Sequence, residues 1–124
     1  MEDITSEIQN IKSGMVVTAH PDDAEYGCSG TVAKLTNSGA EMVYVLCTDG
    51  SKGTEDKNLS PSELAGIRKN EQLNAGKVLG LKDVAFLGYP DAYLTPSLDV
   101  RKDIARQIRI HKPEILICQY PLRN

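Results

Sequence analysis

Four short apolar runs, several of them rich in β-branched residues, alternate along this chain with longer segments whose apolar residues recur at helical spacing. The first of these runs, Met15–Ala19, is unbroken enough to suggest a strand buried on both faces, and the other three runs are also predicted to be strands. Strands that alternate with helices in this way favour right-handed βαβ units and a mainly parallel sheet. The predicted strands are Met15–Ala19, Met42–Cys47, Val84–Leu87 and Ile115–Cys118.

Three helices are predicted between these strands, at about 30–38, 61–79 and 98–111. The second has the clearest boundaries, because Ser60 and Glu63 form a capping box and Gly80 is a C-terminal stop. The expected fold class is therefore α/β, a Rossmann-like three-layer domain. A further helix is expected after the fourth strand, yet only residues 119–124 follow it. We therefore expect residues 1–124 to be a single α/β domain, truncated after the fourth strand, that forms the N-terminal part of a longer one.

The composition narrows the range of partners. Of the 124 residues 40% are hydrophobic and 25% are charged, with a net charge of −3, as in one soluble globular domain. Acidic and basic residues are mixed, so no basic block is available to follow a phosphate backbone, and no nucleic-acid partner is expected. No apolar run approaches the roughly 20 residues that cross a bilayer, so no membrane partner is expected. A homo-oligomer is left open.

The three cysteines, Cys28, Cys47 and Cys118, are widely spaced and form no Cys-x-x-Cys pair. Neither a disulfide framework nor a thiolate zinc site is indicated. Cys47 and Cys118 lie within apolar runs and are expected to be small buried residues. The first ten residues are polar and acidic, unlike a targeting peptide. Together these features favour a reducing, cytoplasmic location.

Polar residues gather in three predicted loops, at 20–28, 49–59 and 88–96, each directly after one of the first three strands. Ligands of open α/β sheets bind outside the carboxyl ends of the strands. These loops are therefore the expected place of the functional site.

The densest set of reactive side chains is His20-Pro21-Asp22-Asp23, directly at the end of the first strand. An imidazole and carboxylates in close array suit a divalent metal such as zinc. If the chain turns into a helix here, His20 and Asp23 can hold one ion and leave Asp22 free as a general base. The alternative is structural: a strand-end histidine followed by two aspartates that cap a helix.

This run resembles the opening motif of the LmbE-like, or PIG-L-type, family of zinc-dependent N-acetylglucosaminyl deacetylases. The resemblance extends over Thr18-Ala19-His20-Pro21-Asp22-Asp23-Ala24-Glu25, followed by Gly27 and Gly30. Four further segments resemble family motifs in the family's order, so that nearly the whole chain from Met15 is covered. They are Thr48-Asp49-Gly50 with Gly53, Arg68 with Glu71, Phe86-Leu87-Gly88-Tyr89-Pro90-Asp91, and His111-Lys112-Pro113-Glu114.

The resemblance implies a zinc-dependent hydrolase that removes the N-acetyl group from an N-acetylglucosamine-type sugar or its conjugate. It implies that His20 and Asp23 bind zinc and that Asp22 is the catalytic general base. It also implies that Arg68 and Asp91 contact the sugar or fix its orientation, and that Asp49 supports the substrate site. Arg68 suits contact with a sugar because the fork of donors on its guanidinium fits hydroxyl or phosphate oxygens.

Two of these residues have structural alternatives. Arg68 can instead belong to a solvated helix face, and Asp49 can be a turn-forming residue before Gly50.

The chain departs from the family pattern in length. Family members take a third zinc ligand from a His-x-x-His-type segment beyond the fourth strand, and this sequence ends before that point. The second histidine, His111, precedes the fourth strand and is predicted to be structural. A catalytic zinc usually has three protein ligands. We therefore expect weak zinc binding by these residues alone, or an inactive fragment that lacks the third ligand.

Two functions of other classes are left open. One is a non-catalytic carbohydrate- or nucleotide-binding domain in which Gly27-Cys28-Ser29-Gly30 receives an anion at a helix N-terminus. Its spacing matches neither a dinucleotide fingerprint nor a P-loop. The other is a metal-dependent hydrolase of phosphate esters, for which the chain offers few carboxylates.

Overall fold

One parallel sheet organises the described part of the chain. The computed structural model describes residues 10–20, 23–48, 60–90 and 97–118, with the backbone alone for residues 23–27 and 61. Within these ranges four strands lie in the order β3-β2-β1-β4, and all neighbouring strands are parallel. The elements are β1 (Ser13–Thr18), α1 (Asp23–Asn37), β2 (Glu41–Thr48), α2 (Pro61–Leu79), β3 (Asp83–Tyr89), α3 (Leu98–His111) and β4 (Ile115–Cys118).

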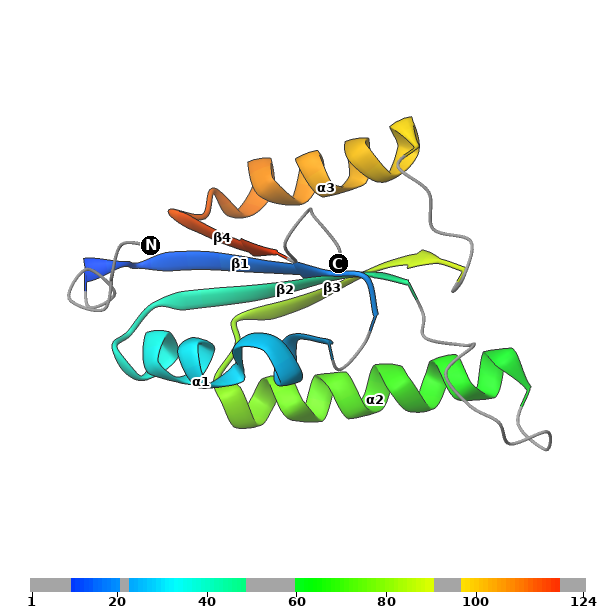
Figure 1. Ribbon diagram of the computed structural model, residues 1–124, viewed down its shortest axis with the longest axis horizontal. Coiled ribbons are helices and arrows are strands. Elements are labelled where there is room, and N and C mark those ends of the chain that lie inside the picture. Colours follow the sequence, from blue (N-terminus) through cyan, green and yellow to red (C-terminus); the bar gives the residue numbers. More distant parts are fainter. Residues whose placement is uncertain (1–9, 21–22, 49–59, 91–96, 119–124) are drawn as a thin grey trace, which may run out of the picture.

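Helices cover both faces of the sheet (Figure 1). α1 and α2 lie on one face and α3 lies on the other. The chain steps from β1 to β2 and β3 on the first face, then returns past β1 to β4 with α3 on the opposite face. The predicted three-layer α/β fold with a mainly parallel sheet is confirmed. Because the strand order reverses between β1 and β4, the carboxyl ends of these two strands border the position where such sheets bind ligands.

The predicted helices are present, and two of them have the predicted boundaries. In α2, Ser60 Oγ accepts a hydrogen bond from the backbone N–H of Glu63 at 3.1 Å, and Gly80 closes the helix with φ of 77°. α1 begins at Asp23 rather than near Gly30. The prediction followed apolar spacing, and the first turns of α1 are polar or small residues that give no such pattern. None of the helices in the described ranges is long and apolar enough to cross a membrane.

β2 is the most deeply buried element, with seven of its eight residues buried. Met42 and Tyr44, both 0% exposed, pack with Val16 of β1 and with Val32 and Leu35 of α1. Full burial of an aliphatic side chain of this size stabilises the folded state by about 1.5–3 kcal/mol. This cluster therefore fixes α1 against the two central strands.

α2 contacts the sheet along a row of residues spaced by four or eight positions. Leu64, Gln72 and Gly76 are buried on this row. A Cβ added at Gly76 would lie 3.3 Å from side-chain atoms of Leu81 and Val84. The missing side chain thus lets the helix lie close to β3.

The apolar spacing that predicted α2 does not mark its buried face. Ile67, Leu73 and Val78 are 43%, 38% and 88% exposed. Because α2 approaches β3 closely at Gly76, the row of α2 residues that contains Gln72 faces the sheet. The three exposed apolar residues lie beside that row or on the opposite face of the helix.

Cys118 corrects another expectation. Cys47 is buried as predicted, whereas Cys118 is exposed. β4 is an edge strand among the described strands. Leu116, on the same side of β4 as Cys118, is also 47% exposed. An apolar run therefore identified the strand correctly but not the burial of each of its residues.

Two glycine substitutions test this packing. A Cβ at Gly14 in β1 would lie 2.7 Å from Met42 Sδ and 2.8 Å from Ile115 Cγ2, and Met42 is fully buried. Gly14→Ala is expected to lower the free energy of unfolding by about 1–2 kcal/mol. The cost of overpacking the core exceeds the gain from removing the conformational freedom of glycine in the unfolded chain. At Gly66, inside α2, an added Cβ meets nothing within 4 Å. Gly66→Ala should raise stability by about 0.5–1 kcal/mol.

Urea unfolding followed by circular dichroism measures both changes. A Gly14→Ala variant as stable as the unmodified chain would contradict the tight contact between β1, Met42 and Ile115.

Candidate active site

The backbone at the end of β1 is held by two threonine hydroxyls. The carbonyl of Ala19 accepts two hydrogen bonds from Thr48 of β2, one from its backbone N–H at 2.8 Å and one from Oγ1 at 2.7 Å. One residue on, the carbonyl of His20 accepts a hydrogen bond from Thr18 Oγ1 at 3.3 Å. Both threonines are buried, at 2% and 7% exposure. The chain therefore stays attached to β2 up to the residue before His20.

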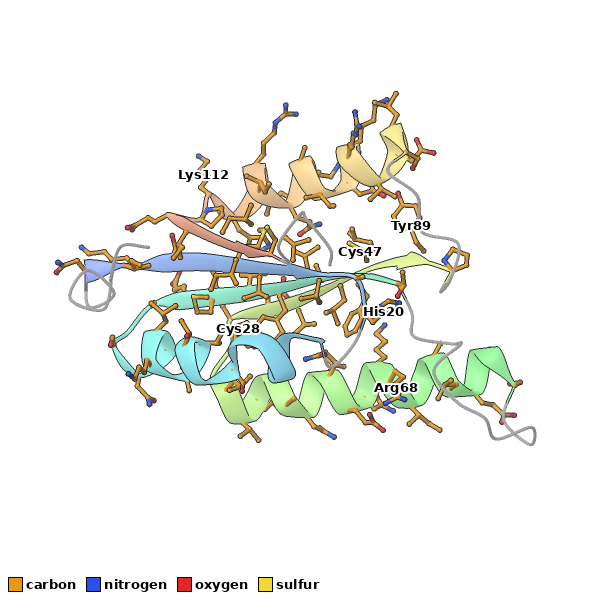
Figure 2. The ribbon with its side chains drawn as sticks, in the orientation of Figure 1. His20, Cys28, Cys47, Arg68, Tyr89 and Lys112 are labelled. Atoms are coloured by element: carbon orange, nitrogen blue, oxygen red, sulfur yellow. The ribbon has the colours of Figure 1, made fainter. Side chains whose placement is uncertain are left out.

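His20 lies at the carboxyl end of β1 and is exposed. Figure 2 shows it where the chain leaves the sheet toward the face covered by α1 and α2. β1 is a central strand that borders the reversal of strand order. An imidazole in this position can reach a ligand or an ion held outside the sheet edge.

The carboxylates of the predicted site fall largely outside the described residues. Asp23 is the first residue of α1, and only its backbone is described. Asp22, Asp49 and Asp91 lie outside the described ranges. Within these ranges no group of three His, Cys, Asp or Glu residues is arranged to hold a metal. The predicted grouping of His20 with Asp23 therefore stays a prediction.

The strand ends nevertheless fix where the predicted loops start. Asp49 directly follows Thr48, the last residue of β2, and Asp91 comes two residues after Tyr89, the last residue of β3. The strands are parallel, so these starting points and His20 share one edge of the sheet.

Arg68 occupies the inward row of α2, midway between the buried residues Leu64 and Gln72. Its guanidinium Nη1 lies 3.4 Å from Glu71 Oε2, and its side chain is 28% exposed against 49% for that of Glu71. Figure 2 shows Arg68 on the same side of the sheet as His20. The two residues are thus on one face of the domain. The predicted contact between Arg68 and the sugar stays a prediction.

The residue after Arg68 ties the same part of α2 to β3. Lys69 Nζ lies 5.2 Å from the centre of the Phe86 ring. A cation over an aromatic face at this distance is attractive. The contact therefore helps hold the segment of α2 that carries Arg68 against β3.

A bulge redirects the chain at the end of β3. Leu46 pairs with Phe86, but Thr48 pairs with Tyr89, so β3 has one more residue than β2 between these pairs. Gly88 supplies the left-handed conformation, with φ of 79°. Bulges of this kind turn the side chains that follow them, and they are frequent beside functional sites.

Sequence reasoning predicted no role for the side chains of Tyr89 and Asp103. The Tyr89 hydroxyl donates a hydrogen bond to the carboxylate of Asp103 on α3. This bond raises the pKa of Tyr89 to about 12, and burial and the negative charges of Asp103 and Asp99 act in the same direction. The two residues are fourteen positions apart and share no local pattern. Sequence reasoning also predicted no role for the Thr48 side chain, because it named Thr48 only as the first residue of the segment Thr48-Asp49-Gly50.

Cys47 lies on the α3 side of the sheet, away from His20 (Figure 2). Burial raises the pKa of its thiol. The thiolate is the nucleophilic form of cysteine, so Cys47 is a poor nucleophile at neutral pH. Its role is in packing.

Residues 15–124 match the PIG-L family, GlcNAc-PI de-N-acetylase. The chain is 38% identical over 118 residues to diacetylchitobiose deacetylase from Thermococcus kodakarensis. This match covers 95% of the chain and 44% of that protein. It is 31% identical over 120 residues to a probable N-acetyl-alpha-D-glucosaminyl L-malate deacetylase 2 from Bacillus anthracis, covering 92% of this chain and 53% of that protein.

A solved structure agrees with these relatives. N,N'-diacetylchitobiose deacetylase from Pyrococcus horikoshii, in complex with its inhibitor MPG, matches with a TM-score of 0.87 at 38% identity. The match covers 92% of this chain and 43% of that one. The chain thus spans about half the length of the relatives it matches.

The bond between Tyr89 and Asp103 predicts a pH effect. It stabilises the neutral phenol, so its contribution to stability is fully present below a pH of about 10 and is lost as the pH rises toward 12. Asp103→Asn should lower the pKa of Tyr89 toward 10, because the charged acceptor is removed. Titration of tyrosinate by ultraviolet absorbance, with Tyr89→Phe to identify the step, measures this. An unchanged titration in Asp103→Asn would show that another group controls the phenol.

Proposed function

The chain belongs to the PIG-L family of GlcNAc-PI de-N-acetylases, and from this membership we propose that it carries the metal-binding and proton-transfer residues of an amide hydrolase. The reaction is removal of the N-acetyl group from an N-acetylglucosamine-type sugar or its conjugate. The observation that carries the proposal is the position of His20, fixed by hydrogen bonds on both sides at the carboxyl end of a central strand.

His20 and Asp23 are the residues proposed to hold zinc. The donor set fits the ion, since an imidazole nitrogen and a carboxylate oxygen are both common zinc ligands. His20 comes from the end of a strand and Asp23 begins the next helix. Zinc bound there would polarise the acyl carbonyl and make water more acidic. We propose that the third protein ligand comes from a segment beyond residue 124.

Asp22 is proposed as the general base. It lies between the two proposed ligands, and its carboxylate would accept a proton from the water that attacks the acyl carbon. The same carboxyl would then give that proton to the nitrogen of the sugar as the amide C–N bond breaks. The products are acetate and an amino sugar.

Arg68, Asp91 and Asp49 are proposed to bind or orient the sugar. Support for Arg68 comes from its place on the inward row of α2 and from its half-buried side chain. Support for the two aspartates comes from the strand ends that precede them, which lie at the same sheet edge as His20.

The proposed substrates share an N-acetylglucosamine unit. The relatives are named for diacetylchitobiose and for an L-malate conjugate of N-acetylglucosamine. The common chemical feature is an acetamido group on a hexose, and the attached group differs. We therefore propose the acetamido sugar as the recognised part of the substrate.

A cytoplasmic location is also proposed. Cys28, Cys47 and Cys118 are all free thiols in the described part of the chain. Free thiols are typical of proteins kept in a reducing compartment.

Two substitutions test the proposed roles in the full-length protein. Asp22→Asn should retain zinc and lower acetate release from N,N'-diacetylchitobiose by roughly a hundredfold to ten-thousandfold, as loss of a general base does. His20→Ala should lose zinc. Metal content is measured by atomic spectroscopy and acetate by a coupled assay.

Matched controls come from the opposite end of the sheet, where the strands begin. Asp83→Asn and His111→Ala make the same chemical changes at the start of β3 and at the end of α3, and both should keep zinc and turnover. Release of phosphate instead of acetate, or zinc binding without any hydrolysis, would contradict the proposal. The first outcome indicates a phosphoesterase and the second a binding domain.

A further inference from the structure

Thr48 holds one backbone carbonyl through two hydrogen bonds. Both its backbone N–H and its hydroxyl donate to one acceptor, the carbonyl of Ala19, at 2.8 and 2.7 Å. The N–H continues the ladder between β1 and β2 beyond the last paired residues, Thr18 and Leu46. The hydroxyl adds a second bond at the point where the chain leaves the sheet.

This double contact fixes the peptide that leads into His20. Thr48 is 2% exposed, so water has little access to replace its hydroxyl. A buried carbonyl that lost the bond would keep one donor instead of two and would be freer to tilt. Thr18 Oγ1 donates a hydrogen bond to the next carbonyl, that of His20. Together the two hydroxyls set the direction in which the His20 side chain leaves the strand.

Thr48 also connects His20 to the other loops of the site. It pairs with Tyr89 across the bulge in β3, and Tyr89 is in turn bonded to Asp103 on α3. The residue after Thr48 is Asp49. Movement at Thr48 would therefore reach the starting points of three loops.

We propose that Thr48 is a positioning residue for the active site, whose hydroxyl holds His20 in the orientation that binds metal. The inference rests on the proposed function, because it gives His20 a metal to bind. It assigns to Thr48 no contact with substrate and no part in proton transfer. Its effect passes through the carbonyl of Ala19.

The chain offers a control with the same chemistry. Thr36 Oγ1 in α1 donates to the carbonyl of Leu79 at the end of α2, also at 2.7 Å. This bond joins two helix ends and involves no residue of the predicted site. Thr48→Val and Thr36→Val each replace one such hydroxyl by a methyl group of similar size. Thr48→Ser keeps the hydroxyl and serves as the rescuing variant.

Three experiments are made on the full-length protein. Competition with a chelating dye gives the zinc dissociation constant, steady-state kinetics give kcat and KM for N,N'-diacetylchitobiose, and NMR of the metal-free protein gives the histidine resonances. Thr48→Val should weaken zinc binding about tenfold, as loss of a supporting hydrogen bond around a metal ligand does. It should lower kcat more than it changes KM, because the lost hydroxyl bonds the carbonyl of Ala19 and none of the residues proposed to bind the sugar. Thr48→Ser and Thr36→Val should bind zinc like the unmodified protein.

The metal-free spectra make the result independent of activity. In Thr48→Val the His20 signal should broaden or double, while the signal of His111, at the other edge of the sheet, stays as it was. Equal zinc affinity, kcat and His20 signals in Thr48→Val and Thr36→Val would overturn the inference.

If the unmodified protein neither binds zinc nor releases acetate, the proposed function fails, and the His20 signal alone then decides the role of Thr48. A change confined to Thr48→Val supports positioning, and no change overturns it.

Discussion

Burial of the two central strands on both faces is the constraint on which this domain depends. β2 has seven buried residues of eight, and β1 lies between β2 and β4. Such strands are stable only when helices cover both faces. Covering both faces with helices requires crossover connections between parallel strands. Such crossovers place the carboxyl ends of all the described strands at the same end of the sheet. The gathering of His20 and the loop starts at that edge is thus a consequence of how the apolar strands are buried.

The change from buried to exposed residues takes place within one or two residues at this edge, as from Thr18 to His20. Thr18 and Thr48 are the last buried residues of β1 and β2. Each is β-branched and therefore suited to a strand, and each carries a buried hydroxyl that needs a hydrogen-bond partner. The groups available to pair them are the carbonyls of Ala19 and His20, where the chain turns away from the sheet. The requirement to satisfy buried polar atoms therefore also determines the geometry of the backbone that carries the predicted metal ligand.

The extent of successful prediction follows from how local each signal is. The capping box at Ser60 and the stop at Gly80 are local, and α2 has those boundaries. The strand at Ile115–Cys118 was found from its apolar run, but the exposure of Cys118 depends on what lies beside β4 and has no local signal. The buried row of α2 depends on close packing at Gly76, which hydrophobic spacing does not record.

The candidate site shows the same division. The position of His20 at the end of β1 followed from the strand run and the rule for parallel sheets. The bond from Tyr89 to Asp103 joins a strand end to a helix fourteen residues later, and only the folded chain brings them together. Resemblance to a family supplied roles for Asp22, Asp23, Asp49 and Asp91 that the residue pattern left open.

The proposed metal ligands belong to two different elements, and this bears on stability as well as on catalysis. His20 ends β1, which is anchored in the sheet, and Asp23 starts α1, which is anchored by Val32 and Leu35. An ion held by both would connect the strand to the helix across residues 21–22, so its binding energy would add to the stability of this junction. The anchoring works in the opposite direction too. Hydrogen bonds from Thr18 and Thr48 hold the backbone at His20 in place. If His20 binds an ion as proposed, less ordering would be required on binding, and the affinity of a site with few ligands would be improved.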